Sequence, residues 1–421
     1  MDQYAQIIGF MGPLFLAAIA VEFALDRRRK RGTYRLNDAV NSLSLGILST
    51  YVRIGLRLLM LVPYAWVADH VAPWKLPADH WAVWVLAFVL YDFCYYWLHR
   101  LSHEWNFLWA VHVVHHQSEE FNLTTALRQA ALVPLVAWPF YMPLALLGVP
   151  WEVTGVVSIL QLLYQFWPHT RHVDRLGPLD RWVQTPSNHR VHHAQNDVYL
   201  DRNYGGILML WDRMFGTFQD ELREEPPVYG VRGQLKSWNP VWANWHVWQD
   251  MAATAWKTRS WGDKLRVWVA RPGWRPADVP KAPYTLDQFR LYDPPLSPGL
   301  KAYVLAQFGA AYLLTAHYLK VIHDLSAWDA TLYAATLTAL LLTLGGLMEG
   351  RRVFLGLEAG RAAATGLAAL LAGSWFGVEG DWVPLAGGAY AALSLAGLWA
   401  AAGGAGRAAV GDKGDLKVTL R

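Results

Sequence analysis

The chain has 421 residues, of which 54% are hydrophobic and 17% are charged, and its formal net charge at pH 7 is +4. A soluble domain of this length usually carries more charge, and the apolar residues form long runs, so the composition favours an integral membrane protein. The small net charge, spread in short clusters, gives no support to nucleic-acid binding. The single cysteine, Cys94, excludes an intrachain disulfide and a cysteine metal cage, and it is interpreted as a small buried hydrophobe.

Apolar segments long enough to form membrane helices recur along the chain, at residues 7–25, 40–68, 79–98, 130–167, 301–320, 328–348, 362–378 and 383–402. A helix needs about 20 residues to cross the hydrocarbon layer. Segment 40–68 is long enough to cross with a tilt or a bend. Segment 130–167 contains four prolines and is predicted to form two helices joined near Gly148 and Pro150, because proline breaks the helical hydrogen-bond ladder.

Basic residues predict the orientation of these helices. The first apolar segment is followed by the basic run 27–31, which is typical of a retained helix whose far end is cytoplasmic. Successive crossings then bring His99, His169 and the pair Arg351 and Arg352 to the same side. We therefore expect the clustered histidines to face the cytoplasm. The compact loops and Ala/Gly/Arg-rich C-terminal sequence favour a bacterial source, and hence the inner membrane.

The expected fold is all-α: a polytopic membrane helical protein with a cytoplasmic helical domain that carries the histidines. Residues 1–300 are predicted to form the catalytic domain and residues 301–421 a C-terminal bundle of transmembrane helices. The tryptophan-rich segment 238–274 fits two interpretations, an amphipathic stretch in the membrane interface or a packing surface against the catalytic domain.

Ten of the fifteen histidines fall into four clusters. Residues three or four apart on a helix share a face, so the rings of one cluster can reach one ion. One ion takes about four protein ligands, so ten candidates predict two metal ions. The candidates are His99 and His103, then His112, His115 and His116, then His169 and His172, then His189, His192 and His193.

The chemistry of the clusters narrows the choice of metal. Imidazole suits iron, zinc and copper alike, but a hydrolytic two-metal site usually carries bridging carboxylates, and the clusters contain almost none. A neutral nitrogen set in a membrane favours two iron ions that activate O2 against an apolar substrate. Asp92, inside an apolar helix, and Glu104, beside His103, are predicted to support the ligands; the alternatives are a surface Glu104 and an Asp92 capped by the backbone or by Arg100.

The order of the histidine clusters, and the stretches 92–100, 122–129, 163–170, 185–193 and 203–218, resemble the fatty acid hydroxylase and sterol desaturase superfamily, and within it the alkylglycerol monooxygenases. The similarity covers about residues 85–240 and implies a di-iron centre held by the eight histidines of the first, second and fourth clusters. His169 matches a further family histidine, whereas His172 has no counterpart, and Asn188 stands where the alkylglycerol enzymes tend to carry a histidine.

The resemblance also implies a reaction. It implies that the chain hydroxylates a lipid taken from the bilayer, using O2 and tetrahydrobiopterin as reductant, at the carbon beside an ether oxygen. Three alternatives stay open: hydroxylation or desaturation of a sterol, fatty acid, carotenoid or hopanoid-like lipid; a zinc-dependent membrane hydrolase; and a metal transporter or sensor. The last is disfavoured because transport ligands lie near the middle of membrane helices. Tyr204, Gly205 and Gly206 are interpreted as an ordinary turn rather than a close backbone approach.

Overall fold

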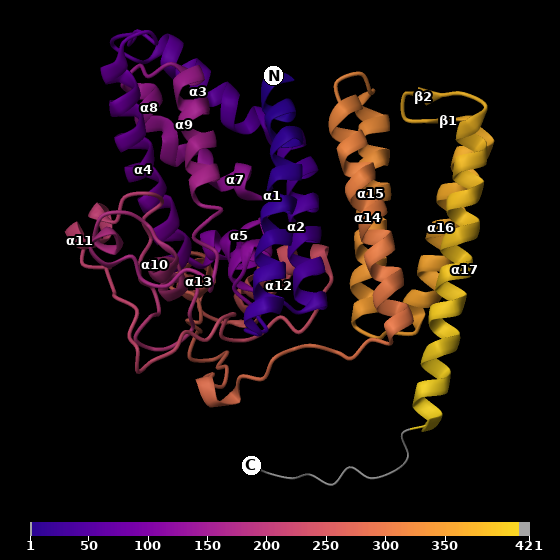
Figure 1. The fold of residues 1–421 in the computed structure, drawn as a ribbon. Coiled ribbons are helices and arrows are strands. Elements are labelled where there is room, and N and C mark those ends of the chain that lie inside the picture. Colours follow the sequence, from indigo (N-terminus) through magenta and orange to yellow (C-terminus); the bar gives the residue numbers. More distant parts are fainter. Residues whose placement is uncertain (1, 412–421) are drawn as a thin grey trace. The chain divides into compact units, whose positions relative to one another are not determined.

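The structure is a computed structural model that describes residues 2–411, and Figure 1 shows that helices dominate it. It divides into two compact units. One, the histidine unit, comprises Ala17–Lys236 and Val241–Tyr292, and the other, the C-terminal unit, comprises Met1–Leu16, Ser237–Pro240 and Asp293–Arg421. All ten clustered histidines therefore lie in the histidine unit.

The first part of the chain forms long helices and then short ones. These are α1 (Asp2–Arg29), α2 (Leu36–Leu56), α3 (Leu58–His70), α4 (Trp81–Glu104), α5 (Asn106–His116), α6 (Leu123–Ala126), α7 (Val133–Ala137), η1 (Trp138–Tyr141), α8 (Met142–Leu146) and α9 (Trp151–Tyr164). The remaining elements of this unit are η2 (Gly177–Arg181), α10 (Pro186–His192), α11 (Leu210–Met214), α12 (Pro240–Lys257), α13 (Trp261–Val269) and η3 (Leu286–Gln288), with Pro240 itself in the C-terminal unit.

Several helices are long and apolar enough to cross a membrane. Among the described residues, four qualify singly, namely α4 together with α15 (Ala327–Met348), α16 (Val353–Ala372) and the part of α17 at Trp382–Ala402. Helices α2 and α3 qualify as a pair that bends by 43°, so segment 40–68 does bend. The expected all-α, polytopic membrane architecture is confirmed.

Prolines divide segment 130–167 more finely than the sequence analysis predicts. The expected break near Gly148 is present, because α8 ends at Leu146 and α9 begins at Trp151. Gly148 has a φ of +74°, and a Cβ there would lie 2.0 Å from the Trp74 carbonyl oxygen, so the turn requires glycine. The part before this break is not one helix but the three short pieces α7, η1 and α8, each of which has proline in its first turn.

The tryptophan-rich segment packs within the histidine unit in part, and its placement in the membrane interface stays a prediction. Trp248, Trp268 and Trp274 pack against the buried side chains of Met251 and Val267, which joins α12 and α13 to α5. On other faces of the same segment, Trp256 and Trp261 are 87% and 80% exposed. The segment is therefore a packing surface on one side and an exposed aromatic surface on the other.

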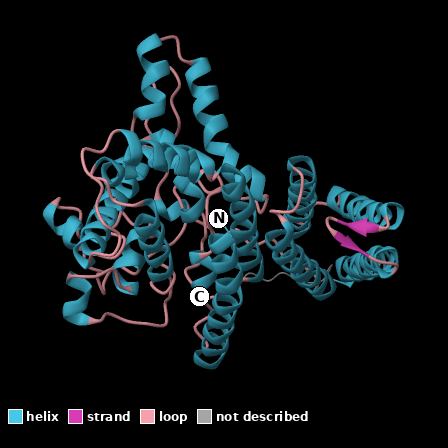
Figure 2. Cartoon of the chain, turned by 90° about the horizontal axis from the view of Figure 1, so that it is seen from above, coloured by secondary structure: helices cyan, strands magenta, loops and turns pink. Residues whose placement is uncertain are grey.

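The C-terminal unit is a bundle of α14 (Pro298–Val321), α15, α16 and α17 (Trp382–Gly411), with one antiparallel strand pair, β1 (Ser374–Trp375) and β2 (Val378–Glu379), between the last two helices (Figure 2). Glu358 of α16 is fully buried there and accepts hydrogen bonds from Tyr303 of α14 and Thr343 of α15. Arg361 donates two further bonds to the same carboxylate. Helix α16 begins at Val353, nine residues before the predicted apolar segment, and so includes both members of this ion pair.

Candidate metal centre

Three helices carry most of the clustered histidines. His99 and His103 occupy the last turns of α4, and α5 begins two residues after α4 ends and carries His112, His115 and His116. The short helix α10 carries His189 and His192, with His193 as its C-terminal cap. Pro186 at the start of α10 is favourable, because proline lacks only a donor that the first helical turn cannot use.

The histidines converge into two groups that each bring their ring nitrogens within 4.8 Å of one another. The five-histidine group consists of His99, His103, His112, His116 and His192, and the four-histidine group consists of His115, His169, His189 and His193. Each His-x-x-His-His box is therefore shared between the groups. The spacing of three and four residues predicts that His112 lies near both partners, but only His116 joins it.

Distances between ring nitrogens suit metal coordination. In the five-histidine group, His112 Nε2 lies 3.0 Å from the Nε2 atoms of both His99 and His116. In the four-histidine group, His189 Nε2 lies 2.9 Å from His169 Nε2 and 3.1 Å from His193 Nε2. Two nitrogens that bind one ion at about 2.1 Å and at right angles lie about 3.0 Å apart. Within each group the Nε2 atoms thus have the separation expected of ligands to a shared ion.

Backbone carbonyls orient the rings from outside. The Nδ1 atoms of His99, His115, His169 and His192 lie 2.8–2.9 Å from the carbonyl oxygens of Tyr204, Arg128, Gln165 and Arg202, respectively. A carbonyl can only accept, so each of these rings carries its proton on Nδ1 and leaves the Nε2 lone pair free. Such outer partners usually fix the tautomer of metal-bound histidine.

Burial keeps the histidines neutral. It lowers the pKa of His115 to about 4, and it lowers the pKa values of six others well below their ordinary value of 6.5, namely His112, His116, His169, His189, His192 and His193. Neighbouring histidines lower these six pKa values further, because two close imidazolium ions repel each other. A neutral imidazole is the form that binds a metal.

Two buried ring nitrogens show that the site fits a bound metal. The Nε2 atoms of His103 and His192 are buried and, among the described residues, have no hydrogen-bond partner. Buried polar atoms are normally paired, so these two nitrogens need a ligand that the protein does not supply. Two groups of neutral imidazoles with converging lone pairs fit two metal ions, one in each group.

Asp92 and Glu104, the two carboxylates predicted to support the ligands, have different partners in the structure. Asp92 of α4 is fully buried and accepts hydrogen bonds from the backbone N–H groups of Ile207 and Leu208, among others. Glu104 accepts from Arg100, four residues earlier, at 3.0 Å. The described contacts of both carboxylates are with groups other than the histidines, so Asp92 acts through the loop that includes the Tyr204 carbonyl. His103 of the five-histidine group lies beside a different carboxylate, that of Asp201, which is 3.7 Å from its Nδ1 atom.

The loop after α10 approaches α4 more closely than an ordinary turn at Tyr204–Gly206 would. A Cβ on Gly206 would lie 2.0 Å from Gln161 Nε2 and 3.0 Å from Asp92 Oδ1. The expectation of an ordinary turn at Tyr204–Gly206 was wrong, because this turn packs its backbone directly onto the side chains of α4 and α9. The paired glycines are the only sign of this contact in the sequence.

His172 lies outside both histidine groups. Its Nε2 is 3.4 Å from Asp26 Oδ1 and 3.5 Å from the Thr33 hydroxyl, so the ring contacts the end of α1 and the segment after it. Asn188, on α10, donates from its side chain to the carbonyl oxygens of Asp180 and Val183 at 2.7 and 3.1 Å. Both side chains thus hold the surrounding segments in place.

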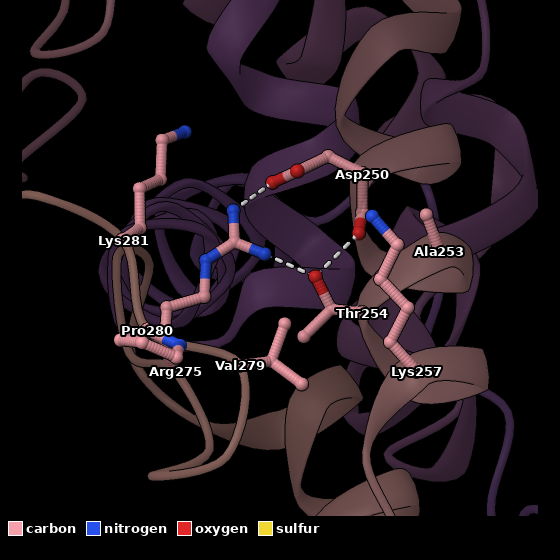
Figure 3. A pocket seen from close by; sticks show the side chains of 8 residues that line it. All are labelled: Asp250, Ala253, Thr254, Lys257, Arg275, Val279, Pro280 and Lys281. Carbon is pink, nitrogen blue, oxygen red and sulfur yellow. Dashed lines mark hydrogen bonds and ion pairs between the residues drawn. The ribbon is translucent and has the colours of Figure 1, made fainter.

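A cavity of about 180 Å³ lies apart from the histidines, between α12 and the segment after α13. Figure 3 shows Arg275 reaching across it to Asp250 and Thr254. Lys257 and Lys281 also line it. Because this lining is cationic and contains no histidine, the cavity has no part in binding the metals.

Comparisons with known proteins agree with the site. Residues 84–217 match the fatty acid hydroxylase family. The alkylglycerol monooxygenase of Danio rerio is 38% identical over 364 residues, which cover 83% of this chain and 79% of that protein. The human alkylglycerol monooxygenase is 36% identical over 346 residues, or 79% of this chain and 75% of that protein.

A bacterial relative is more distant. The ornithine lipid hydroxylase OlsE of Rhizobium tropici is 31% identical over 159 residues, or 36% of this chain and 46% of that protein. The prediction of a bacterial source gains no support, because the alkylglycerol monooxygenases of Danio rerio and human match over more of their length than this bacterial protein does. No solved structure matches the chain. The sequence identity and the histidine boxes together show that this chain belongs to the fatty acid hydroxylase family of membrane lipid hydroxylases, alongside the alkylglycerol monooxygenases.

Proposed function

We propose that the chain is a di-iron monooxygenase that hydroxylates a C–H bond of a membrane lipid. The observation that carries this proposal is the convergence of nine histidines into two adjacent ligand groups. One iron would bind to His99, His103, His112, His116 and His192, and the other to His115, His169, His189 and His193. His172 is left out of this set because its ring contacts Asp26.

Iron is favoured over zinc by the ligand chemistry and by the family. The two groups offer nitrogen ligands without a carboxylate bridge, whereas hydrolytic two-metal sites usually carry one. Bound iron would supply the activation of O2 for insertion of one oxygen atom into the C–H bond. The second oxygen atom leaves as water, and an external reductant supplies two electrons.

The chain's own residues contribute placement and electrostatics. The carbonyls of Tyr204, Arg128, Gln165 and Arg202 hold four rings with Nε2 turned inward. Burial of the rings keeps water away from the centre and keeps the imidazoles neutral near pH 7. Asp92 holds the loop that bears the Tyr204 carbonyl, so its role is positioning rather than direct catalysis.

The substrate that we propose is an O-alkylglycerol ether lipid, with tetrahydrobiopterin as the reductant. Support comes from the alkylglycerol monooxygenases, which align over most of their length. Hydroxylation of the carbon beside the ether oxygen gives a hemiacetal, which collapses to an aldehyde and glycerol. We also propose that the centre faces the cytoplasm, where the basic run 27–31 is expected.

Metal analysis of the purified, detergent-solubilised protein tests the centre. We expect about two irons per chain, and a sharp fall in His112→Ala. The matched control is His246→Ala, since His246 lies on α12 outside both groups and its Nδ1 contacts the Ala243 carbonyl. Two tightly bound zinc ions after iron-replete expression, without O2 consumption on any lipid, would instead indicate a membrane hydrolase.

Product analysis tests the substrate. With an alkylglycerol, O2 and a tetrahydropterin, we expect an aldehyde and glycerol in proportion to the O2 consumed. The second candidate is hydroxylation of a different membrane lipid, which the similarity to an ornithine lipid hydroxylase favours. A protein that holds two irons but leaves alkylglycerols intact while it oxidises another lipid would support this second candidate.

A further inference from the structure

An apolar patch is exposed on η2, on the residue that follows it and on α11. Its members are Leu179, Trp182, Leu210 and Met214, which are 55%, 61%, 38% and 62% exposed. Leu210 and Met214 are four residues apart on α11 and share its outer face, whereas Trp211 and Asp212 of the same helix are buried. Exposed apolar side chains that gather in this way usually mark an interaction surface.

Backbone hydrogen bonds join the two segments of the patch. The Met209 N–H donates to the Trp182 carbonyl at 2.9 Å, and the Gln184 N–H donates to the Ile207 carbonyl at 2.8 Å. Val183 and Leu208 form an antiparallel bridge between these bonds. The two segments that carry the patch are therefore held together by their backbones, which form its support.

Asp92 attaches this support to the middle of a candidate membrane helix. The carboxylate accepts from the Ile207 and Leu208 N–H groups and from Trp211 Nε1, at 2.8, 3.1 and 2.9 Å. Helix α4 has 24 residues and would be about 36 Å long, and Asp92 lies about 18 Å before its C-terminal end. A hydrocarbon layer of about 30 Å that is centred on this helix includes the level of Asp92. Figure 1 shows α11 beside α4 at the side of the unit.

The backbone of this support meets the requirement that a bilayer imposes. Non-helical chain at membrane depth is tolerated only where its polar groups are satisfied within the protein. The N–H groups of Tyr204 and Gly205 donate to the Asp212 carboxylate at 2.8 and 2.7 Å. Those of Ile207 and Leu208 donate to Asp92, and that of Met209 donates to the Trp182 carbonyl, as described. The segment keeps these donors inside and turns apolar side chains outward.

Cationic side chains lie next to the patch. Arg181 precedes Trp182 and Arg213 precedes Met214, and both arginines are exposed. Arginine can lie along apolar surface while its guanidinium reaches towards phosphate groups at the membrane surface. Apolar residues with flanking arginines are the pattern of a surface that enters the outer part of one leaflet.

We propose that the patch of Leu179, Trp182, Leu210 and Met214 inserts into the acyl region of one bilayer leaflet beside α4. The acyl chains of membrane lipids would cover this surface. The patch thus extends the bilayer-facing surface of α4 onto the loop whose Tyr204 carbonyl orients His99. The proposal concerns the membrane contact alone and does not depend on the metal or the substrate.

Site-directed spin labelling of the full chain in lipid nanodiscs tests whether the patch lies in the acyl region. Met214→Cys would carry a nitroxide, with Glu224→Cys as the control at an exposed charged position of the same unit. Labelled wild type corrects for Cys94, which is buried. We expect the label at position 214 to be relaxed more by O2, which concentrates in acyl chains, than by a water-soluble nickel chelate, and the label at position 224 to show the reverse.

Two results would overturn the proposal. Preferential relaxation by nickel at position 214, as at the control, would show that the patch faces water. Protection from both reagents with dipolar broadening between labels would show that a second copy of the chain covers it. If Met214→Cys does not give monodisperse protein, Trp182→Cys is read by the same criteria, because its side chain is equally exposed.

Discussion

A methyl group added at residue 206 tests how the loop holds the centre. In Gly206→Ala the new Cβ would lie 2.0 Å from Gln161 Nε2. Gln161 cannot simply move aside, because it is buried and its amide donates to Asp92 at 2.7 Å. Either this bond breaks, or the loop withdraws and loses the bonds from Ile207 and Leu208 to Asp92.

The expected loss of stability follows from these two outcomes. A lost hydrogen bond to a charged group costs about 1.5–3 kcal/mol, and forcing an extra methyl into a packed interior costs about 1–3 kcal/mol. We therefore expect a loss of about 2–6 kcal/mol in the free energy of unfolding of the histidine unit, and a fall of roughly 5–20 °C in its thermal midpoint. The same loop carries the Tyr204 carbonyl that orients His99, so the five-histidine group should lose its metal first.

The assay compares the metal content and thermal midpoint of Gly206→Ala with those of Gly155→Ala. Gly155 lies on α9, and a Cβ there would have no atom within 4 Å, so this control adds the same methyl group without a clash. Equal metal content and equal midpoints in the two variants would refute the idea that close packing of this loop holds the centre.

Three further predictions concern other parts of the chain. His172→Asn should keep the metal content of the wild type while His169→Asn loses most of it, and equal losses would place His172 among the ligands. Glu358→Gln should expose the α15–α16 connection to protease, because loss of one partner of a buried ion pair costs about 3–5 kcal/mol and leaves the Arg361 charge unpaired; unchanged digestion would contradict this. In the metal-free protein, the free energy of unfolding should fall as the pH drops from about 6.5 to 4. The pKa of His115 is about 4 in the folded chain and about 6.5 in the unfolded chain, so the unfolded chain binds the proton first, and this group alone contributes about 3 kcal/mol. Unfolding curves that do not change with pH would refute this prediction.

The sequence identifies the class of the protein well, because that information is local. Apolar runs of about 20 residues predict membrane helices whatever their neighbours are, and the structure has such helices at α4, α15, α16 and α17. Prolines similarly mark the breaks in segment 130–167. Helix boundaries are less predictable where a charged residue has a buried partner, as with Glu358 and Arg361. The hydrophobicity of a stretch of sequence does not indicate which charged residues will pair in the fold.

The number of clustered histidines predicts two metal ions, but only the tertiary structure decides how the ligands are shared. Spacings of three and four place His115 and His116 equally well beside His112. Their assignment to different groups depends on what packs around α5, since His192 meets one side of it and His169 the other. His172 looks like its neighbour His169 in the sequence, yet the fold turns it towards α1. Residue spacing thus determines which rings can share a helix face, whereas contacts between segments far apart in the chain determine which rings can share an ion.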